Sequence, residues 1–336
     1  MFRRMIILLL ALSIVSVGTI AHADIALLRS TGAGTCGDAD EAISSQRKDP
    51  FFTVEHRPTS SFTLSTGQVV PIPFPVYGAD ASIVYGLVDA SMVERIMADT
   101  GYKPVVTRGR AIARLFIWEL DTVVGPYEEL AILFDASTDD IRVPWVNGYS
   151  SFLPTVDPRV TYYMHKLILD RWPSIYFGRE FLGFDKIFGC IDIARTGNPL
   201  LGTTRTFSFR DTAGRAVLDG HVNEPDAAAT TLLAAHRLGE AMGVDTPVYV
   251  PSLYPELVVG GVSRDVMDGG RSLKHHVVNV RLGGVVTEFD GDLRINRESP
   301  IGAQLLAMGF EPTVVYRDPS VMFVMDLAPD GTPLIP

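Results

Sequence analysis

The feature of this sequence that most limits its fold is a series of short apolar runs, each ended by polar, glycine or aspartate residues. Examples are Ala111–Trp118, Leu130–Phe134 and Thr161–Leu169. Runs of this length, rich in β-branched and aromatic residues and bounded by turn residues, are typical of buried strands. The 30 glycines and 22 prolines supply the many turns that such strands require. The chain is therefore expected to build its core from a sheet.

Strand patterns continue along the rest of the chain, with few helices between them. Further strands are expected over Ser82–Val88, Lys186–Ile193, Thr203–Phe209, Arg215–His221, Val248–Val250, Leu257–Val259, His275–Leu282, Val285–Phe289, Thr313–Tyr316 and Val321–Leu327, with Gly283-Gly284 as a hairpin turn. Helices are expected after Ser91, from Pro173 to Gly183, over Asp226–Met242 and over Pro300–Met308. Because helices do not regularly separate the strands, the expected fold class is α+β, with one domain on a mainly antiparallel sheet that is curved or closed.

The first residues have the organisation of a secretory signal peptide. Arg3 and Arg4 precede the apolar run Ile6–Val17, and Ala21-His22-Ala23 provides the small residues of a cleavage site. A retained membrane anchor is the alternative, but the apolar run is short for a span of ~20 residues. We expect a secreted or periplasmic protein that is cut after Ala23 and has no membrane contact afterwards. The expected organisation is a signal peptide over 1–23, an irregular extension over 24–71, one domain over 72–330 and a tail over 331–336.

The charge balance limits the partners of the protein. The sequence has 29 basic and 39 acidic residues, which gives a formal net charge of −10. Binding to nucleic acid is not expected, because phosphate groups require a basic face.

Cys36 and Cys190 are the only two cysteines. In an oxidising compartment they could form one disulfide. Two unpaired, buried side chains are the alternative, since closeness in space cannot be read from the sequence.

The segment from Tyr163 to Gly189 carries the residues that point to chemistry. It contains a strand with His165, a Leu169-Asp170-x-x-Pro173 turn, a Gly178-Arg179-Glu180 helix and the segment Gly183-Phe184-Asp185-Lys186. The element Gly125-Pro126-Tyr127-Glu128-Glu129 precedes it. In order and spacing these elements resemble the acetoacetate decarboxylase-like superfamily, and the resemblance extends over about residues 70 to 328.

The resemblance implies a barrel- or cone-shaped sheet with an active site around one lysine. In that superfamily the first lysine of a Gly-Phe-Pro-Lys-Lys-type segment forms a Schiff base, which gives Lys186 this role and makes Glu129 the active-site acid. The implied activity is that of a carboxy-lyase on a small keto acid or other carbonyl compound, by decarboxylation or related C–C bond chemistry, without cofactor or metal. The side chains expected to bind the substrate are Phe184, Phe188, Arg179 and His165. Association into a homo-oligomer is left open.

The residues themselves give a physical reason for a lysine at this position. Alternation along a strand places Phe184, Lys186, Phe188 and Cys190 on one face. Apolar surroundings disfavour an ammonium ion and favour the free amine, which is the form that attacks a carbonyl carbon. Two neighbours differ from the superfamily pattern, since Asp185 replaces the proline and Ile187 replaces the second lysine.

A second function class stays open beside the enzyme. The chain could be a non-catalytic protein that binds a small molecule in the same cavity. A buried amine beside Glu129 favours the enzyme, whereas an exposed amine, or one paired with Asp185, favours the binding protein.

Several of the polar residues also have structural interpretations. Arg179 and Glu180 could form an ion pair within the short helix, and His165 could be a half-buried histidine with satisfied hydrogen bonds. His275 and His276 are adjacent, so on a strand they face opposite sides and make a poor metal pair.

Overall fold

A computed structural model describes residues 45–146, 149–152, 154, 157–198, 202–224, 248–249, 257–281 and 284–328. The expected signal peptide, residues 24–44 of the extension, Cys36, the helix over 226–242, Gly283 and the tail over 331–336 lie outside the described residues.

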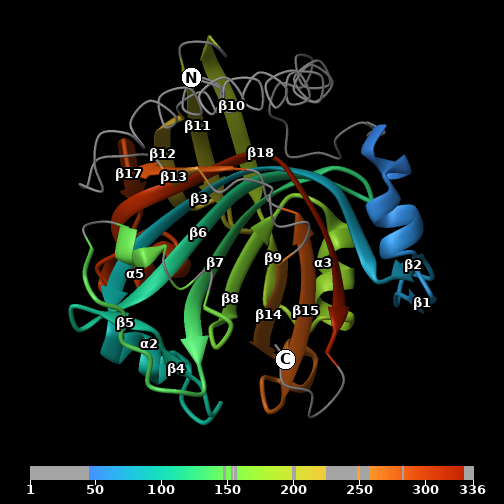
Figure 1. Ribbon diagram of the computed structural model, residues 1–336, viewed down its shortest axis with the longest axis horizontal. Helices are drawn as coiled ribbons and strands as arrows, with labels where there is room; N and C mark the ends of the chain where they lie inside the picture. Colours follow the sequence, from blue (N-terminus) through green and yellow to red (C-terminus); the bar gives the residue numbers. More distant parts are fainter. Residues whose placement is uncertain are drawn as a thin grey trace, which may run out of the picture.

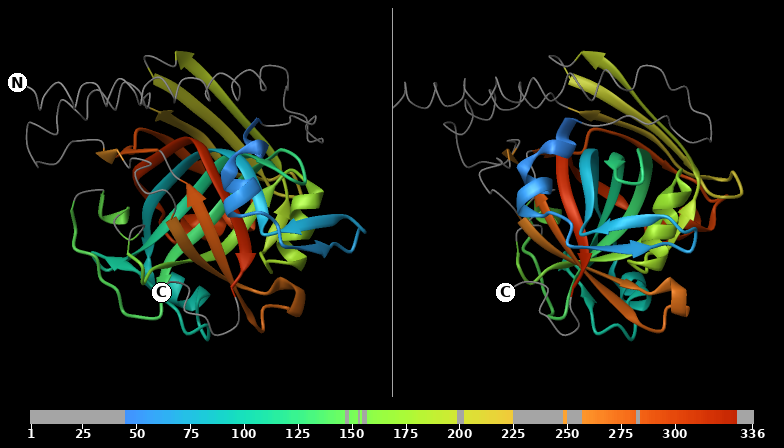
Figure 2. Two further views of the ribbon diagram at one scale, coloured as in Figure 1. Left: turned by 45° about the vertical axis from the view of Figure 1, so that its right-hand side comes forward. Right: turned by 90° about the vertical axis from the view of Figure 1, so that its right-hand side faces the viewer.

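Seven long strands close into a ring (Figures 1 and 2). Each strand pairs with the next and the last with the first, in the order β3 (Phe74–Asp89), β6 (Arg110–Thr122), β7 (Tyr127–Ser137), β8 (Thr161–Leu169), β14 (Leu257–Arg264), β15 (Leu273–Arg281) and β18 (Glu311–Leu327). The neighbours are antiparallel except β8 and β14, which are parallel. The expected fold class, a mainly antiparallel and closed sheet with a few short helices, is confirmed.

Strand β18 closes the ring and corrects two expectations about the C-terminal part of the chain. The two runs expected at Thr313–Tyr316 and Val321–Leu327 form this one strand, with irregular register where they join. The expected hairpin between β15 and β16 (Val285–Glu288) is wrong, because both strands pair with β18 one after the other along its length. Since both are antiparallel to β18, β15 and β16 run in the same direction, whereas the strands of a hairpin run in opposite directions.

A second sheet lies over one side of the ring (Figure 2). It contains β10 (Cys190–Asn198), β11 (Gly202–Arg210), β12 (Ala216–Glu224) and β17 (Gly291–Ile295). The strand expected over Lys186–Ile193 is divided between the two sheets, because β9 (Lys186–Phe188) pairs with β8 of the ring. The division falls at Gly189, where a Cβ atom would lie 2.3 Å from the Arg210 carbonyl oxygen.

Among the described residues, three short helices and several short strands complete the fold. The helices are α2 (Ala90–Ile96), α3 (Trp172–Glu180) and α5 (Pro300–Ala307). Asp89, and not the expected Ser91, caps α2 by accepting a hydrogen bond from the Met92 N–H. Short strands β4 (Lys103–Pro104), β5 (Val106–Thr107) and β13 (Val248–Tyr249) extend the large sheet, and η3 (Tyr149–Ser151) and η5 (Val266–Asp268) are single turns. None of the helices within the described ranges has the length and apolar character needed to cross a membrane.

The described part of the extension has regular structure, which differs from the expected irregular segment. It contains the turns η1 (Ser45–Lys48) and η2 (Phe51–Glu55), followed by a hairpin of β1 (Ser60–Thr63) and β2 (Val69–Ile72). Phe51 and Phe52 are buried against Val324 of β18. Ser65, at the hairpin turn, donates backbone and hydroxyl hydrogen bonds to the Glu180 carboxylate. The extension therefore packs against the ring and α3.

Alternating side chains give the ring two apolar faces. Inward-facing residues such as Ile83, Phe116 and Phe323 form one core. Outward-facing residues such as Val84 and Leu115 pack against the second sheet to form another. Lys186 lies on the inner face, so the site is enclosed by the ring.

Six charged side chains join the outer face of the ring to the second sheet. Their carboxylates are Asp80, Glu119 and Glu224, and their guanidinium groups are Arg195, Arg205 and Arg317. We call this set the charged network. Arg205 is fully buried and donates to Asp80, Glu119, the Ser82 hydroxyl and two backbone carbonyls.

Candidate active site

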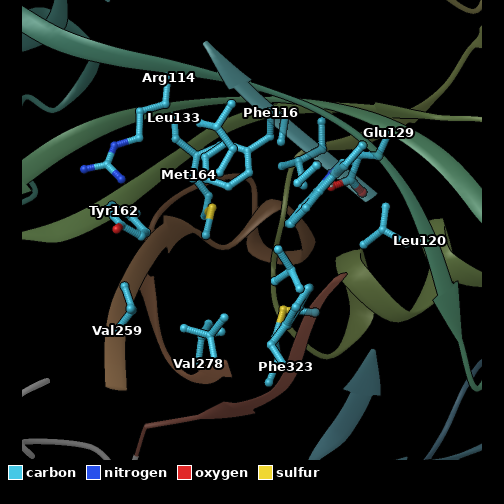
Figure 3. A pocket seen from close by; sticks show the side chains of 18 of the residues that line it. Arg114, Phe116, Leu120, Glu129, Leu133, Tyr162, Met164, Val259, Val278 and Phe323 are labelled. Atoms are coloured by element: carbon cyan, nitrogen blue, oxygen red, sulfur yellow. Dashed lines mark hydrogen bonds between the residues drawn. The ribbon is translucent and has the colours of Figure 1, made fainter. Parts of the chain in front are cut away.

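The ring encloses a cavity of about 120 Å³ (Figure 3). Inward-facing side chains of all seven ring strands line it, together with β9 and the segment before it. Most are apolar, including Phe116, Leu133, Met164, Val278 and Phe323. An apolar cavity with a few polar groups is the usual form of a small-molecule site.

Lys186 and Glu129 meet in the wall of this cavity. The Lys186 Nζ lies 3.1 Å from the Glu129 Oε2, and each side chain is only 3% exposed. The Trp118 Nε1–H donates to the other carboxylate oxygen, Oε1, over 3.1 Å. The rings of Tyr127 and Phe184 lie 5.5 Å and 5.9 Å from the amine. The amine is thus held in apolar surroundings with one carboxylate partner.

The register of the sheet brings Glu129 to this position. Glu129 lies on β7 opposite Trp118 of β6, and Tyr127 lies two residues before it on the same face. Burial, and after it the charge of Glu129, raises the pKa of Tyr127 well above its usual value. Tyr127 therefore contributes a neutral phenol at any ordinary pH.

Gly178 gives the Lys186 side chain its path from β9 past helix α3. A Cβ atom at Gly178 would lie 2.3 Å from Cδ and 2.5 Å from Cε of Lys186. The neighbouring Arg179 donates from Nη1 to the Lys186 carbonyl oxygen over 3.3 Å. Gly178 therefore leaves space for the Lys186 side chain, and Arg179 holds the Lys186 backbone by a hydrogen bond.

Four successive backbone carbonyl groups of the chain between α3 and β9 accept hydrogen bonds that hold this segment in place. Lys274 Nζ donates to the carbonyls of Glu180 and Phe181, over 3.1 and 2.9 Å. The Ser263 hydroxyl donates to that of Leu182 over 3.3 Å, and the Val266 N–H to that of Gly183 over 3.1 Å. Because Lys186 follows within a few residues, these bonds fix the direction from which its side chain enters the cavity.

His276 lies behind Phe184, with ring centroids 4.7 Å apart. Its Nε2 lies 3.0 Å from the Ser263 hydroxyl. Burial, and then the charges of His275 and Lys274, lowers the pKa of His276 to about 3. The imidazole is therefore neutral around pH 7 and supports Phe184 without adding charge.

The structure brings together three of the six residues that the sequence assigns to catalysis or substrate binding. Lys186, Glu129 and Phe184 line the cavity. The other three lie outside its lining. Phe188 stacks on Trp172 with centroids 5.0 Å apart, because β9 has passed beyond the cavity at this residue. Arg179 bonds the backbone as described.

His165 also lies outside the cavity lining, since its side chain projects from the outer face of β8. Its Nε2 lies 3.0 Å from Gln304 Oε1 in helix α5, and its ring packs against Phe134. Burial lowers the pKa of His165 from its usual value. This placement agrees with the structural interpretation of the residue.

The two residues that differ from the superfamily pattern do not contact the Lys186 amine. Asp185 forms an ion pair with Lys166 on β8. Ile187 packs in the core on the outer face of the ring, opposite to Lys186. The alternative interpretation of Arg179 and Glu180 as an ion pair within α3 does not describe the structure, in which Glu180 accepts hydrogen bonds from Ser65.

Cys190 begins β10 and is disulfide-bonded. The only other cysteine of the sequence is Cys36, which lies outside the described residues. Alternation along one strand does not carry from Lys186 to Cys190, because Gly189 separates β9 from β10.

Arg114 is a cavity residue that the sequence reasoning missed. It projects inward from β6 and forms a bidentate ion pair with Asp135, over 2.5 and 2.7 Å. The guanidinium lies 4.7 Å from the Tyr85 ring and 4.2 Å from the Tyr162 ring. Burial alone would lower the pKa of Arg114, but the Asp135 carboxylate raises it above its usual value. The available signal was a charged residue inside the apolar run 111–118.

The described residues contain no cluster of three or more His, Cys, Asp or Glu side chains with an arrangement suited to a metal ion.

Comparison with known proteins gives structural similarity only. No family model matches the chain, and no curated protein matches it. Similar solved structures include acetoacetate decarboxylase from Legionella pneumophila subsp. pneumophila, with 12% identity, a TM-score of 0.45 and coverage of 77% of this chain and 88% of that chain.

Two further similar structures are the enduracididine biosynthesis enzyme MppR, complexed with the condensation product of pyruvate and imidazole 4-carboxaldehyde, and another acetoacetate decarboxylase. Each has 13% identity, a TM-score of 0.44 and coverage of 76% of this chain and 89% of the other. With identities and TM-scores this low, the similarities carry no conclusion about what this chain binds or converts.

Proposed function

We propose that this protein is a lyase that forms a Schiff base between Lys186 and the carbonyl group of a keto acid. The observation that carries the proposal is the contact of 3.1 Å between the Lys186 amine and the Glu129 carboxylate, both buried in an apolar cavity. Of the two function classes that the sequence left open, this arrangement favours the enzyme. The pairing of Asp185 with Lys166 also favours it, because it leaves the Lys186 amine to Glu129.

The proposed reaction begins when the free amine of Lys186 attacks the ketone carbon of a 3-keto acid, whose carboxylate is carried by the carbon next to the ketone. Loss of water gives an iminium ion, which accepts the electron pair of the C–C bond as CO₂ departs. Protonation of the resulting enamine at carbon, followed by hydrolysis of the imine, releases a ketone and restores the amine. The net reaction consumes one proton for each CO₂ released and needs no oxidant or reductant.

Glu129 is the group in reach for these proton transfers. It takes the proton of the Lys186 ammonium, returns it to the departing oxygen as water forms, and later delivers a proton to the enamine carbon. Trp118 bonds only Oε1, so Oε2 remains directed at the amine. Removal of such a group usually slows a reaction by a factor of about 10² to 10⁴, which is the expected effect of Glu129→Gln on turnover.

The test is reductive trapping of the protein with borohydride and a panel of keto acids and diketones, followed by peptide mapping. We expect the label on Lys186. The Lys186→Arg variant keeps a positive charge but cannot form an imine, so labelling and turnover should be lost while the fold is retained. The matched control is Lys166→Arg, on the neighbouring strand β8, which should label like the wild type.

Labelling spread over the other lysines, or unchanged in Lys186→Arg, would contradict the Schiff base. If keto acids bind without any trapping at Lys186, the protein is a binding protein that uses the same cavity. Equilibrium dialysis with the same panel distinguishes this result from a failure to bind.

We also propose that the protein is exported and that its signal peptide is cut after Ala23. The disulfide-bonded state of Cys190 supports an oxidising compartment. A bridge between Cys36 and Cys190 stays a prediction. Intact mass and N-terminal sequencing of the mature protein should give Asp24 as the first residue, and thiol counting on the unreduced, denatured protein should find no free thiol.

A further inference from the structure

The cavity has polar groups at two separate places. Figure 3 shows Glu129 on one side and Arg114 with Tyr162 on the other, with Leu133, Met164 and Phe116 between them. On β6, Arg114 is four residues before Trp118, which is the register partner of Glu129. Four residues of a strand span about 13 Å, so the two polar places are separated by roughly that distance along the sheet.

The wall between these two places is apolar. The inward-facing positions that follow Arg114 and precede Glu129 in the register of β6, β7 and β8 are Phe116, Ala131, Leu133, Met164 and Leu167. A ligand that reaches from one polar place to the other must therefore present an apolar middle section, because an unpaired polar group there would lose its hydrogen bonds to water.

The Arg114 end is electrically balanced. Asp135 neutralises the guanidinium through two hydrogen bonds, and Tyr85 accepts a third from Nη1 over 3.4 Å. Tyr162 takes part in the same cluster. Even if Tyr162 uses a fourth N–H, these contacts among described residues leave one of the five guanidinium N–H groups for a ligand.

Charge balance selects between a neutral and an anionic ligand end. A carboxylate beside Arg114 and Asp135 would give this end a net negative charge inside an apolar cavity, which is costly. A hydroxyl, ether or carbonyl oxygen accepts the remaining N–H without adding charge.

From this we infer that the cavity is built for an elongated carbonyl compound, which places its carbonyl at Lys186, an apolar chain across the middle and a neutral oxygen at Arg114. The inference rests on the proposed function for the Lys186 end and on the geometry of β6 and β7 for the other. In this arrangement Arg114 selects substrates by their length and by the chemical group at the end far from the carbonyl.

The test compares two non-reactive series, 1-alkanols and α,ω-alkanediols of about six to about twelve carbons, whose lengths bracket the ~13 Å span. Titration calorimetry on the wild-type protein gives the ratio of the alkanol Kd to the diol Kd at each length. At most lengths the second hydroxyl should weaken binding, because it enters the apolar part of the cavity. At the length where this hydroxyl reaches Arg114, the ratio should have a maximum about tenfold above its value for the shortest pair.

A ratio without a maximum along the series would overturn the inference. So would tighter binding of α,ω-dicarboxylates than of ω-hydroxy carboxylates of the same length, because the Arg114 end would then select a charge. In the double variant Arg114→Met with Asp135→Leu, which removes both charges together, the maximum should vanish. If this variant does not fold, the wild-type series decides alone.

A third series distinguishes failure of the inference from failure of the proposed function. Borohydride trapping is repeated with methyl ketones and ω-hydroxy methyl ketones of the same lengths. A length maximum in diol binding without labelling of Lys186 would refute the Schiff base and keep the Arg114 subsite. Labelling of Lys186 without any length maximum in diol binding would support the Schiff base and refute the Arg114 subsite.

Discussion

Two groups of buried charges lie on opposite faces of the same sheet, and they are bonded very differently. On the outer face, each arginine of the charged network contacts at least two carboxylates, and Arg205 makes hydrogen bonds to two carboxylates, a hydroxyl and two carbonyls. On the inner face, the described contacts of the Lys186 amine with charged groups consist of Glu129 alone. Both sets are buried except for Arg195 of the network, whose side chain is 28% exposed.

The difference shows which buried charges serve the fold and which are available for reaction. A charge that several partners hold is fixed in place, and removing one member of a buried cluster leaves part of the remaining charge uncompensated. A lysine with one carboxylate partner can transfer its proton to that partner without breaking any other ion pair. We therefore expect the network to carry stability and the Lys186–Glu129 pair to contribute little to it.

The largest expected effect is that of Arg205→Met in the charged network. It removes the fully buried guanidinium from Asp80 and Glu119, so that the remaining arginines no longer balance the three carboxylates, and should lower the free energy of unfolding by about 3–5 kcal/mol. Denaturant unfolding at pH 7 measures this loss. The matched control is Arg294→Met, whose side chain is 72% exposed and should cost less than about 0.5 kcal/mol. Equal effects of the two variants would contradict the role of the network.

Acid should separate the two faces of the sheet by pH range. His276, behind the cavity, has a pKa near 3 in the folded protein and binds a proton in the unfolded chain below about 6.5. Its contribution is therefore complete above pH 6.5 and decreases as the pH falls. Between pH 7 and pH 5 this one histidine should lower the free energy of unfolding by about 2 kcal/mol.

The network should respond at lower pH. Burial raises the pKa of Glu224, but Arg317, Arg205 and Arg195 outweigh it, so the pKa lies below its usual value. Its stabilisation is present above pH ~4.3 and is lost as the pH falls further. Denaturant unfolding at pH 7, 5 and 3.5 should show a smaller loss than in the wild type in both intervals for His276→Gln, because the folded histidine is not protonated until the pH approaches 3. The loss that remains in this variant below pH 5 includes that of the network. A wild-type stability that is flat from pH 7 to 5 would refute the histidine effect.

A smaller effect on stability, but a clear one on the site, is expected for Gly178→Ala. The added methyl group occupies the path of the Lys186 side chain, whereas alanine in a helix is favoured over glycine by about 1 kcal/mol. The two effects oppose each other, so stability should change by about 1 kcal/mol or less. Trapping at Lys186 should slow at least about tenfold, since a misdirected amine loses its orientation toward the carbonyl. An unchanged trapping rate would show that the lysine does not need this path.

The smallest effect on stability is expected when both members of the inner pair are replaced. The double variant Lys186→Met with Glu129→Leu fills the same space with apolar groups and leaves no buried charge without a partner. Its free energy of unfolding should lie within about 1 kcal/mol of the wild type, or above it, while the variant Lys186→Met alone is less stable than the double. If the double variant lost as much free energy of unfolding as Arg205→Met, the Lys186–Glu129 pair would not differ from the charged network in its contribution to stability.

The strands could be predicted from the sequence because their apolar runs are local signals. Thr161–Leu169 was predicted with the same bounds that β8 has. The pairing of the strands was less accessible. Val285–Glu288 follows β15 after a glycine pair, which is a hairpin signal, yet both strands pair with β18 because that strand is long enough to accept both. Such a choice depends on residues far along the chain.

The predicted site residues that belong to motifs lie together in the structure, whereas the positions of other residues depended on tertiary structure and could not be predicted. Lys186 and Glu129 were selected from two separate motifs, and the ring brings them into contact. Arg114 was overlooked, because its role depends on a partner, Asp135, on the neighbouring strand. Phe188 was assigned to the cavity by alternation, which could not show that β9 is only three residues long.

The closure of the ring by its last strand has a consequence for how this protein must be made. Thr313 of β18 donates to the Tyr85 carbonyl of β3 across a sequence separation of 228 residues. Until β18 docks, β3 and β15 each present an open edge, which is a template for pairing with other chains. Contacts this distant in sequence also make folding slow. The interval between synthesis of β3 and arrival of β18 is thus the period in which aggregation competes with folding, and the cavity does not exist before it ends.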